Sequence, residues 1–163
     1  MRGLTVRQPW AWAIIYGGKD VENRSRSLGP YRGPVAIHAG LAPFEQHNMA
    51  SRALRSAHGS EVSAEILFGA IIGVVDLVDV HLDGDCWDRD MRRLARLYRE
   101  HPDEFAALPD DGAGGLIGKV RFCSPWAMDG HHHLVLANPR PLAVSIPYRG
   151  RLGLWTLPDE VPA

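Results

Sequence analysis

Residues 17–24 read Gly-Gly-Lys-Asp-Val-Glu-Asn-Arg, and they join a predicted helix to a predicted strand. The apolar residues 9–16 before them favour a helix, with a proline suited to its first turn and the glycine pair suited to its end. The residues after the glycines favour an extended chain, whose side chains alternate between two faces. Glu22 and Arg24 would therefore project on one face, with Lys19 at the start of the strand. Charges of both signs gathered beside apolar sequence suggest a site.

The composition is that of one globular domain. Of the 163 residues, 45% are hydrophobic and 23% are charged, so we expect a single domain over residues 1–163. No apolar run is long enough to span a bilayer, and the first residues lack a basic region followed by an apolar one. We therefore expect a cytoplasmic protein with no membrane partner. The sequence does not indicate which oligomeric state the protein adopts.

The charges are distributed unevenly. Residues 1–60 carry eight Lys and Arg against three Asp and Glu, a balance of +5, whereas the remaining residues carry ten against sixteen, a balance of -6. Such a split can focus positive potential on an anionic ligand even in a nearly neutral protein. Alternatively, the uneven distribution of charge is accidental and has no functional role.

The pattern of apolar and turn-forming residues predicts many short strands and few helices. Besides the strand after residue 20, strands are expected over residues 2–6, 34–39, 69–82, 116–123, 132–137, 142–146 and 152–157. Further helices are expected over residues 43–58, 85–101 and 103–108. This order predicts an α+β fold, with helices packed around a small barrel or a strongly bent sheet.

Six segments, taken in order, resemble one known family. They are residues 4–11 (LTVRQPWA), 18–24 (GKDVENR), 31–39 (YRGPVAIHA), 72–76 (IGVVD), 138–142 (NPRPL) and 150–155 (GRLGLW). Together they resemble the ASCH domain family, whose hallmark is a GxKxxExR signature, and the resemblance spans nearly the whole chain. It implies a PUA-like small β-barrel with flanking helices, and a cleft whose floor carries the signature.

The resemblance also implies a function in nucleic-acid recognition. Similar proteins are thought to bind RNA or other nucleic acid in the cleft, so the expected partner is RNA, DNA, a nucleoside or a nucleotide. Some relatives are enzymes, either ribonucleases or N4-acetylcytidine deacetylases that use a lysine, a threonine three residues later and a distant glutamate. Lys19 matches that lysine, but Glu22 stands where the deacetylases have threonine. A hydrolase with Lys19 and Glu22 as its catalytic residues remains the alternative to a binding protein.

The charged residues of the signature admit three roles. Lys19 can contact a phosphate, or act as a base with a lowered pKa if it is desolvated beside Arg24. Glu22 would hold Lys19 charged, which favours the binding role. A Lys–Glu–Arg network that only ties the helix to the strand is the structural alternative.

Five further residues are candidates for the rim of the site. Arg7 and Gln8 start the predicted helix, where an arginine suits phosphate and a glutamine can recognise a base edge. Tyr31 and Trp126 lie in loop-like sequence, where a base stacked on the ring contributes roughly 1 to 3 kcal/mol. Arg32 follows Tyr31 in a turn and would contact the nucleic-acid backbone.

No metal and no cofactor are expected. The run from His131 to His133 suggests metal ligation, but strand alternation places at most two of these side chains on one face. Cys86 and Cys123 are far apart in the sequence and lack a second cysteine at metal-binding spacing, so both are expected as reduced thiols. Although His81 lies near Cys86, nothing in the sequence orients a base toward the thiol.

Overall fold

A computed structural model describes residues 1–42 and 66–158, so the helix expected over residues 43–58 lies outside the described residues. The strands are β1 (Arg2–Val6), β2 (Val21–Arg24), β3 (Gly33–Ala39), β4 (Ala70–Leu82), β5 (His132–Pro147) and β6 (Leu154–Thr156). The helices are α1 (Trp10–Tyr16), α4 (Asp83–Glu100), α5 (Pro102–Ala107) and the 3-10 helix η1 (Ile117–Lys119).

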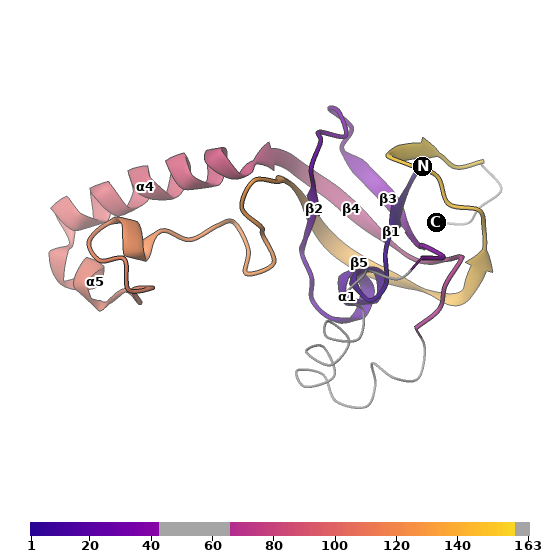
Figure 1. The fold of residues 1–163 in the computed structure, drawn as a ribbon, viewed down its shortest axis with the longest axis horizontal. Coiled ribbons are helices and arrows are strands. Elements are labelled where there is room, and N and C mark those ends of the chain that lie inside the picture. Colours follow the sequence, from indigo (N-terminus) through magenta and orange to yellow (C-terminus); the bar gives the residue numbers. More distant parts are fainter. Residues whose placement is uncertain (43–65, 159–163) are drawn as a thin grey trace.

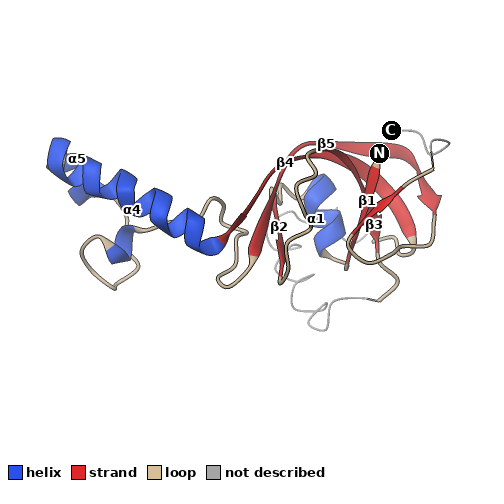
Figure 2. Ribbon diagram, turned by 90° about the horizontal axis from the view of Figure 1, so that it is seen from above, coloured by secondary structure: helices blue, strands red, loops and turns tan. Residues whose placement is uncertain are grey.

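The strands form one curled sheet with the order β2-β5-β4-β3-β1-β6. The pairing of β1 with β3 is parallel, and the other four pairings are antiparallel. β4 and β5 run for 13 and 16 residues, and register shifts along their pairing mark the bulges that bend such strands. Figure 2 shows the resulting half-barrel arching over α1. The chain is therefore an α+β protein with a strongly bent sheet and few helices, as the sequence predicted.

The main core lies between α1 and the concave face of the sheet. Helix α1 contributes Ile14 and Ile15, which are buried against apolar side chains of the strands. The helix lies close to β4 at Gly73, where an added Cβ would stand 2.6 Å from Ile15 Cδ1 and 2.9 Å from the Arg140 carbonyl oxygen. This packing fixes the end of α1, and with it the start of the residue 17–24 stretch.

A helical arm projects from the sheet (Figure 1). β4 passes directly into α4, and α5 and η1 pack back on that helix. The arm has a small core of its own around Leu94, Phe105 and Val120. It meets the sheet where β4 becomes α4 and where the chain returns to β5.

Four predicted strands need correction. The strand expected over residues 116–123 is wrong, because this segment forms η1 and irregular chain whose Leu116 and Val120 pack into the core of the arm. The strands expected over 132–137 and 142–146 are one strand, β5. It contains Asn138, whose φ of 49° coincides with a shift in its register against β4. β6 covers only residues 154–156 of the expected 152–157.

No helix within the described ranges is long and apolar enough to cross a membrane.

Candidate functional site

The three charged residues of the 17–24 stretch contact one another. Glu22 Oε2 lies 3.5 Å from Lys19 Nζ, and Glu22 Oε1 lies 3.0 Å from Arg24 Nη2. β2 places Glu22 and Arg24 on one face, and Gly18, with its φ of 69°, turns the chain between α1 and β2. Lys19 is 5% exposed and Glu22 8%, whereas the Arg24 side chain keeps 27% of its surface accessible. We call Lys19, Glu22 and Arg24 the charged network.

The charged network also ties the two sides of the half-barrel together. Arg24 Nη2 donates a hydrogen bond of 2.8 Å to the Thr5 carbonyl oxygen, which links β2 to β1. Lys19 Nζ donates to the Val21 carbonyl oxygen. The network therefore has the structural role that was one of the three alternatives, and its accessible cation is Arg24.

Burial dominates the electrostatics of Lys19. Desolvation lowers the pKa of Lys19 below its ordinary value of 10.5, although Glu22 and Asp20 raise it. The sequence predicts that Glu22 holds Lys19 charged. In the structure desolvation has a larger effect on this pKa than Glu22, because the Lys19 ammonium group is almost completely removed from water.

Trp126 lies against the charged network although it is more than 100 residues away in the sequence. Its ring centroid is 5.8 Å from Lys19 Nζ, within the range of a cation–π contact. Asn23 of β2 holds the segment in place, because its amide donates to the Trp126 carbonyl oxygen at 2.8 Å and accepts from the Met128 N–H at 2.9 Å. Ser124 donates to the Asp20 carboxylate. Trp126 is half-buried, so the ring borders the network and stays partly accessible.

A cavity of about 100 Å³ lies beside Lys19. Its walls are Ile14, Gly18, Lys19, Asp20, Val75, Leu136, Ala137 and Pro139. Pockets that enclose a drug-sized ligand measure about 300 to 1,000 Å³, so this cavity is too small to enclose a nucleotide. A nucleic-acid ligand would instead contact the accessible rim of the network.

The two candidates at the start of α1 differ in accessibility. Arg7 is exposed, as a phosphate contact requires. Gln8 is completely buried, and it does not line a rim. Its side-chain oxygen accepts from the Trp12 N–H at 3.0 Å and its amide donates to the Leu67 carbonyl oxygen at 2.8 Å. Gln8 therefore stabilises the start of α1.

Tyr31 and Arg32 are held by other partners. The Tyr31 hydroxyl donates to the Pro34 carbonyl oxygen at 2.9 Å, and the Arg2 guanidinium lies 5.7 Å from the ring centroid. Arg32 Nη2 lies 3.5 Å from Asp79 Oδ1 and donates to the Val80 carbonyl oxygen at 3.3 Å. These contacts join the loop before β3 to neighbouring strands, and no described contact links either residue to the charged network.

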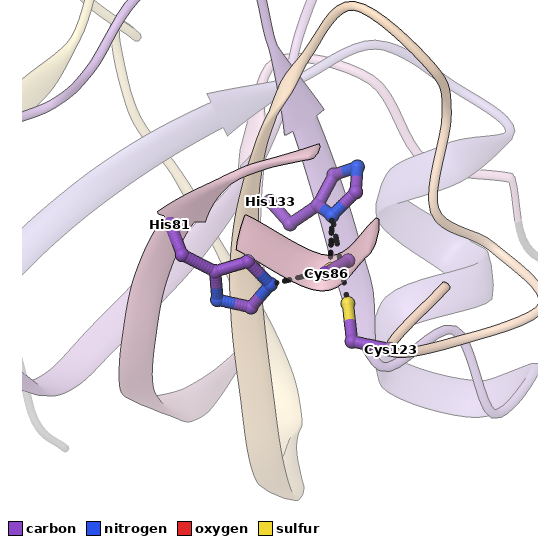
Figure 3. Close-up of side chains that lie close together, drawn as sticks. All are labelled: His81, Cys86, Cys123 and His133. Atoms are coloured by element: carbon purple, nitrogen blue, oxygen red, sulfur yellow. Dashed lines mark hydrogen bonds between the residues drawn. The ribbon is translucent and has the colours of Figure 1, made fainter. Parts of the chain in front are cut away.

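A second group of side chains comes together at the base of the arm (Figure 3). His81, Cys86, Cys123 and His133 each place one potential ligand atom within 4.8 Å of those of the others. The sequence predicts no metal, because these residues do not follow one another at metal-binding spacing. The pairing of β4 with β5 sets His81 opposite His133, while Cys86 comes from the first turn of α4 and Cys123 from the chain that returns from the arm. The one local signal was the pair His81 and Cys86, five residues apart.

Comparison of the sequence with protein-family models and with curated proteins gave no match.

Proposed function

We propose that this chain is an ASCH-like domain of the PUA-like fold that binds RNA or a nucleotide at the rim of the charged network. The observation that carries the proposal is that the Arg24 side chain is held in place and still partly accessible. Its Nη2 lies 3.0 Å from Glu22 Oε1 and donates a hydrogen bond of 2.8 Å to the Thr5 carbonyl oxygen. A guanidinium held in one orientation can donate its remaining N–H groups to a phosphate at a smaller entropic cost than a free side chain.

The surrounding charge supports an anionic ligand. Residues 1–42 contain six Lys and Arg against two acids, Asp20 and Glu22, which gives a balance of +4. Arg7 is exposed and lies two residues after Thr5, which accepts the hydrogen bond from Arg24. Arg7 and Arg24 are thus the proposed phosphate contacts.

The buried members of the charged network have positioning roles in this proposal. Lys19 is too deeply buried to meet a phosphate directly, so it neutralises Glu22 and lies against Trp126. The accessible part of Trp126 then offers an aromatic surface for a base beside the proposed phosphate contacts.

The test is a titration of fluorescein-labelled single-stranded RNA followed by anisotropy, with DNA and free nucleotides as competitors. Arg24→Gln should weaken RNA binding by about tenfold, the effect of losing a charge-assisted hydrogen bond. The matched control is Arg96→Gln, an exposed arginine on the arm whose nearest carboxylate is 4.0 Å away, and it should bind like the wild type. Wild-type affinity in Arg24→Gln would overturn the proposal.

A hydrolase is the second candidate, and the lowered pKa of Lys19 favours it. In molecules whose Lys19 is neutral, its amine can take a proton from a water molecule as that water attacks the acetyl carbonyl carbon of N4-acetylcytidine, which would release cytidine and acetate. The lysine ammonium would pass this proton to the N4 nitrogen as the C–N bond breaks, and Glu22, 3.5 Å from Lys19 Nζ, would orient the ammonium. Incubation with N4-acetylcytidine and with labelled RNA tests this activity. Turnover lost in Lys19→Met and kept in Lys119→Met, the other buried lysine, would support catalysis, whereas unchanged substrates with the wild type would exclude it for these compounds.

A further inference from the structure

The group at the base of the arm has four potential metal-ligand atoms within 4.8 Å of one another. His81 Nε2 lies 2.9 Å from Cys86 Sγ, and His133 Nδ1 lies 3.3 Å from Cys86 Sγ and 3.5 Å from Cys123 Sγ. A zinc ion with Zn–S bonds of about 2.3 Å and Zn–N bonds of about 2.0 Å separates its sulfur and nitrogen ligands by about 3.5 Å. The two Cys–His133 separations are close to this value, and an ion among the four atoms would bind all of them once the side chains adjust to it.

Both imidazoles are oriented as metal ligands. The nitrogen of His81 that faces away from the thiols, Nδ1, lies 2.8 Å from Asp79 Oδ2. The corresponding nitrogen of His133, Nε2, lies 2.8 Å from the Met128 carbonyl oxygen. These oxygen atoms only accept hydrogen bonds, so each neutral ring carries its proton on the outer nitrogen and directs a lone pair at the thiols. Metal-bound histidines are held in this way.

The donor set and its burial indicate which metal binds. Two sulfur and two nitrogen donors in a tetrahedron are typical of zinc, and four protein ligands that leave no position for substrate are typical of a structural site. His133 is completely buried and Cys86 is 3% exposed, whereas Cys123 is exposed and opens a route for the ion.

The four ligands come from the segments that join the arm to the sheet. His81 and His133 are paired across β4 and β5, Cys86 lies in the first turn of α4, and Cys123 lies in the chain that returns from the arm. The arm has only a small core to hold its shape, and units of that size often depend on a metal or a disulfide. An ion at this point would fix the arm to the sheet.

We propose that His81, Cys86, Cys123 and His133 bind a structural Zn²⁺ ion that locks the helical arm to the end of the sheet. The ion would displace the protons of the two thiols and bind both as thiolates. It would also order the chain from Cys123 to Trp126, which borders the charged network. The inference does not depend on the proposed function, because zinc retention and RNA binding are measured separately.

The first test is metal analysis of the full chain after loading with zinc and gel filtration, with cobalt as a spectroscopic probe. We expect equimolar zinc to be retained, and cobalt to give the near-ultraviolet thiolate band and the intense visible bands of a tetrahedral site. A chain that retains no zinc and gives no thiolate–cobalt band would overturn the proposal. So would recovery of the purified chain with a Cys86–Cys123 disulfide that zinc and a reductant do not convert to the metal form.

Variants separate this site from adventitious binding. Cys123→Ser and His133→Asn should each weaken zinc binding at least 100-fold, measured by competition with a chromogenic chelator. Asp79→Asn, which removes the partner of His81, should weaken it about 10- to 100-fold. The matched controls are His132→Asn, next to a ligand on β5 but outside the group, and His101→Asn at the end of α4. Equal zinc affinity in Cys123→Ser and in the controls would overturn the assignment. Because Cys123 is exposed, the Cys123→Ser variant should still fold.

Discussion

Glu22 is the anion between two cations, and at 8% exposure it has little contact with water. Replacing it with glutamine leaves Lys19 and Arg24 close together without a counter-charge. Because breaking a buried ion pair costs about 3–5 kcal/mol, Glu22→Gln should lower the free energy of unfolding by that amount in urea denaturation. The control is Glu100→Gln in the exposed pair with Arg96, where the change should stay within about 0.5 kcal/mol. Equal effects in the two variants would contradict the picture of a buried network.

Because of Lys19, the free energy of unfolding should vary with pH in the alkaline range. Its folded-state pKa lies below 10.5, so between that pKa and 10.5 the unfolded chain holds more protons than the folded chain. The free energy of unfolding of the wild type should therefore rise with pH across this interval, relative to that of Lys19→Met. Chemical denaturation of both proteins from pH 7 to about pH 10.5 measures the difference. A difference that does not change with pH would show that burial does not lower this pKa.

At the scale of elements, the fit between α1 and β4 depends on a glycine. A Cβ at Gly73 would lie 2.9 Å from the Arg140 carbonyl oxygen and 2.6 Å from Ile15 Cδ1, so backbone as well as side chain would have to move. Gly73→Ala should lower the free energy of unfolding by about 1–3 kcal/mol, the usual cost of overpacking. The matched control is Gly84→Ala in α4, where an added Cβ has no neighbour within 4 Å. It should be neutral or stabilising by up to about 1 kcal/mol, because alanine favours a helix.

The elements also show why some sequence predictions were correct and others were wrong. The predicted strand over residues 34–39 is part of β3, because a continuous apolar run suits a strand covered on both sides. The predicted strand over residues 116–123 had a similar apolar content, but its partners turned out to be Leu94 and Phe105 of the arm. Apolar content indicates burial, and it does not identify the surface against which a segment is buried.

At the scale of the whole molecule, charge distribution leads to a prediction about salt. If Arg7 and Arg24 contact phosphates, the logarithm of the RNA association constant should fall linearly with the logarithm of the salt concentration. Loss of one phosphate contact in Arg7→Gln should make that slope shallower by about 0.7, the value for single strands. Arg99→Gln, at the far end of α4, should leave the slope unchanged. An Arg7→Gln slope equal to that of the wild type would remove Arg7 from the interface.

The sequence alone determined most of the strands, the helix before residue 17, the long helix of the arm, and the gathering of Lys19, Glu22 and Arg24. Each of these depends on local rules, namely side-chain alternation, apolar periodicity and the turns at glycine and proline. The α+β class followed from the number and order of these elements. Binding to nucleic acid and membership of the ASCH family remain predictions.

The tertiary structure alone decided how accessible each candidate is and which distant residues meet. The sequence did not show that Gln8 is buried, that Trp126 lies against Lys19, or that the pairing of β4 with β5 brings His81 and His133 together. Accessibility depends on everything that packs over a side chain, and strand pairing depends on the register between segments about 50 residues apart. For this reason the charged residues at 17–24 could be singled out from the sequence, whereas the proposed zinc ligands became visible only after the chain was folded.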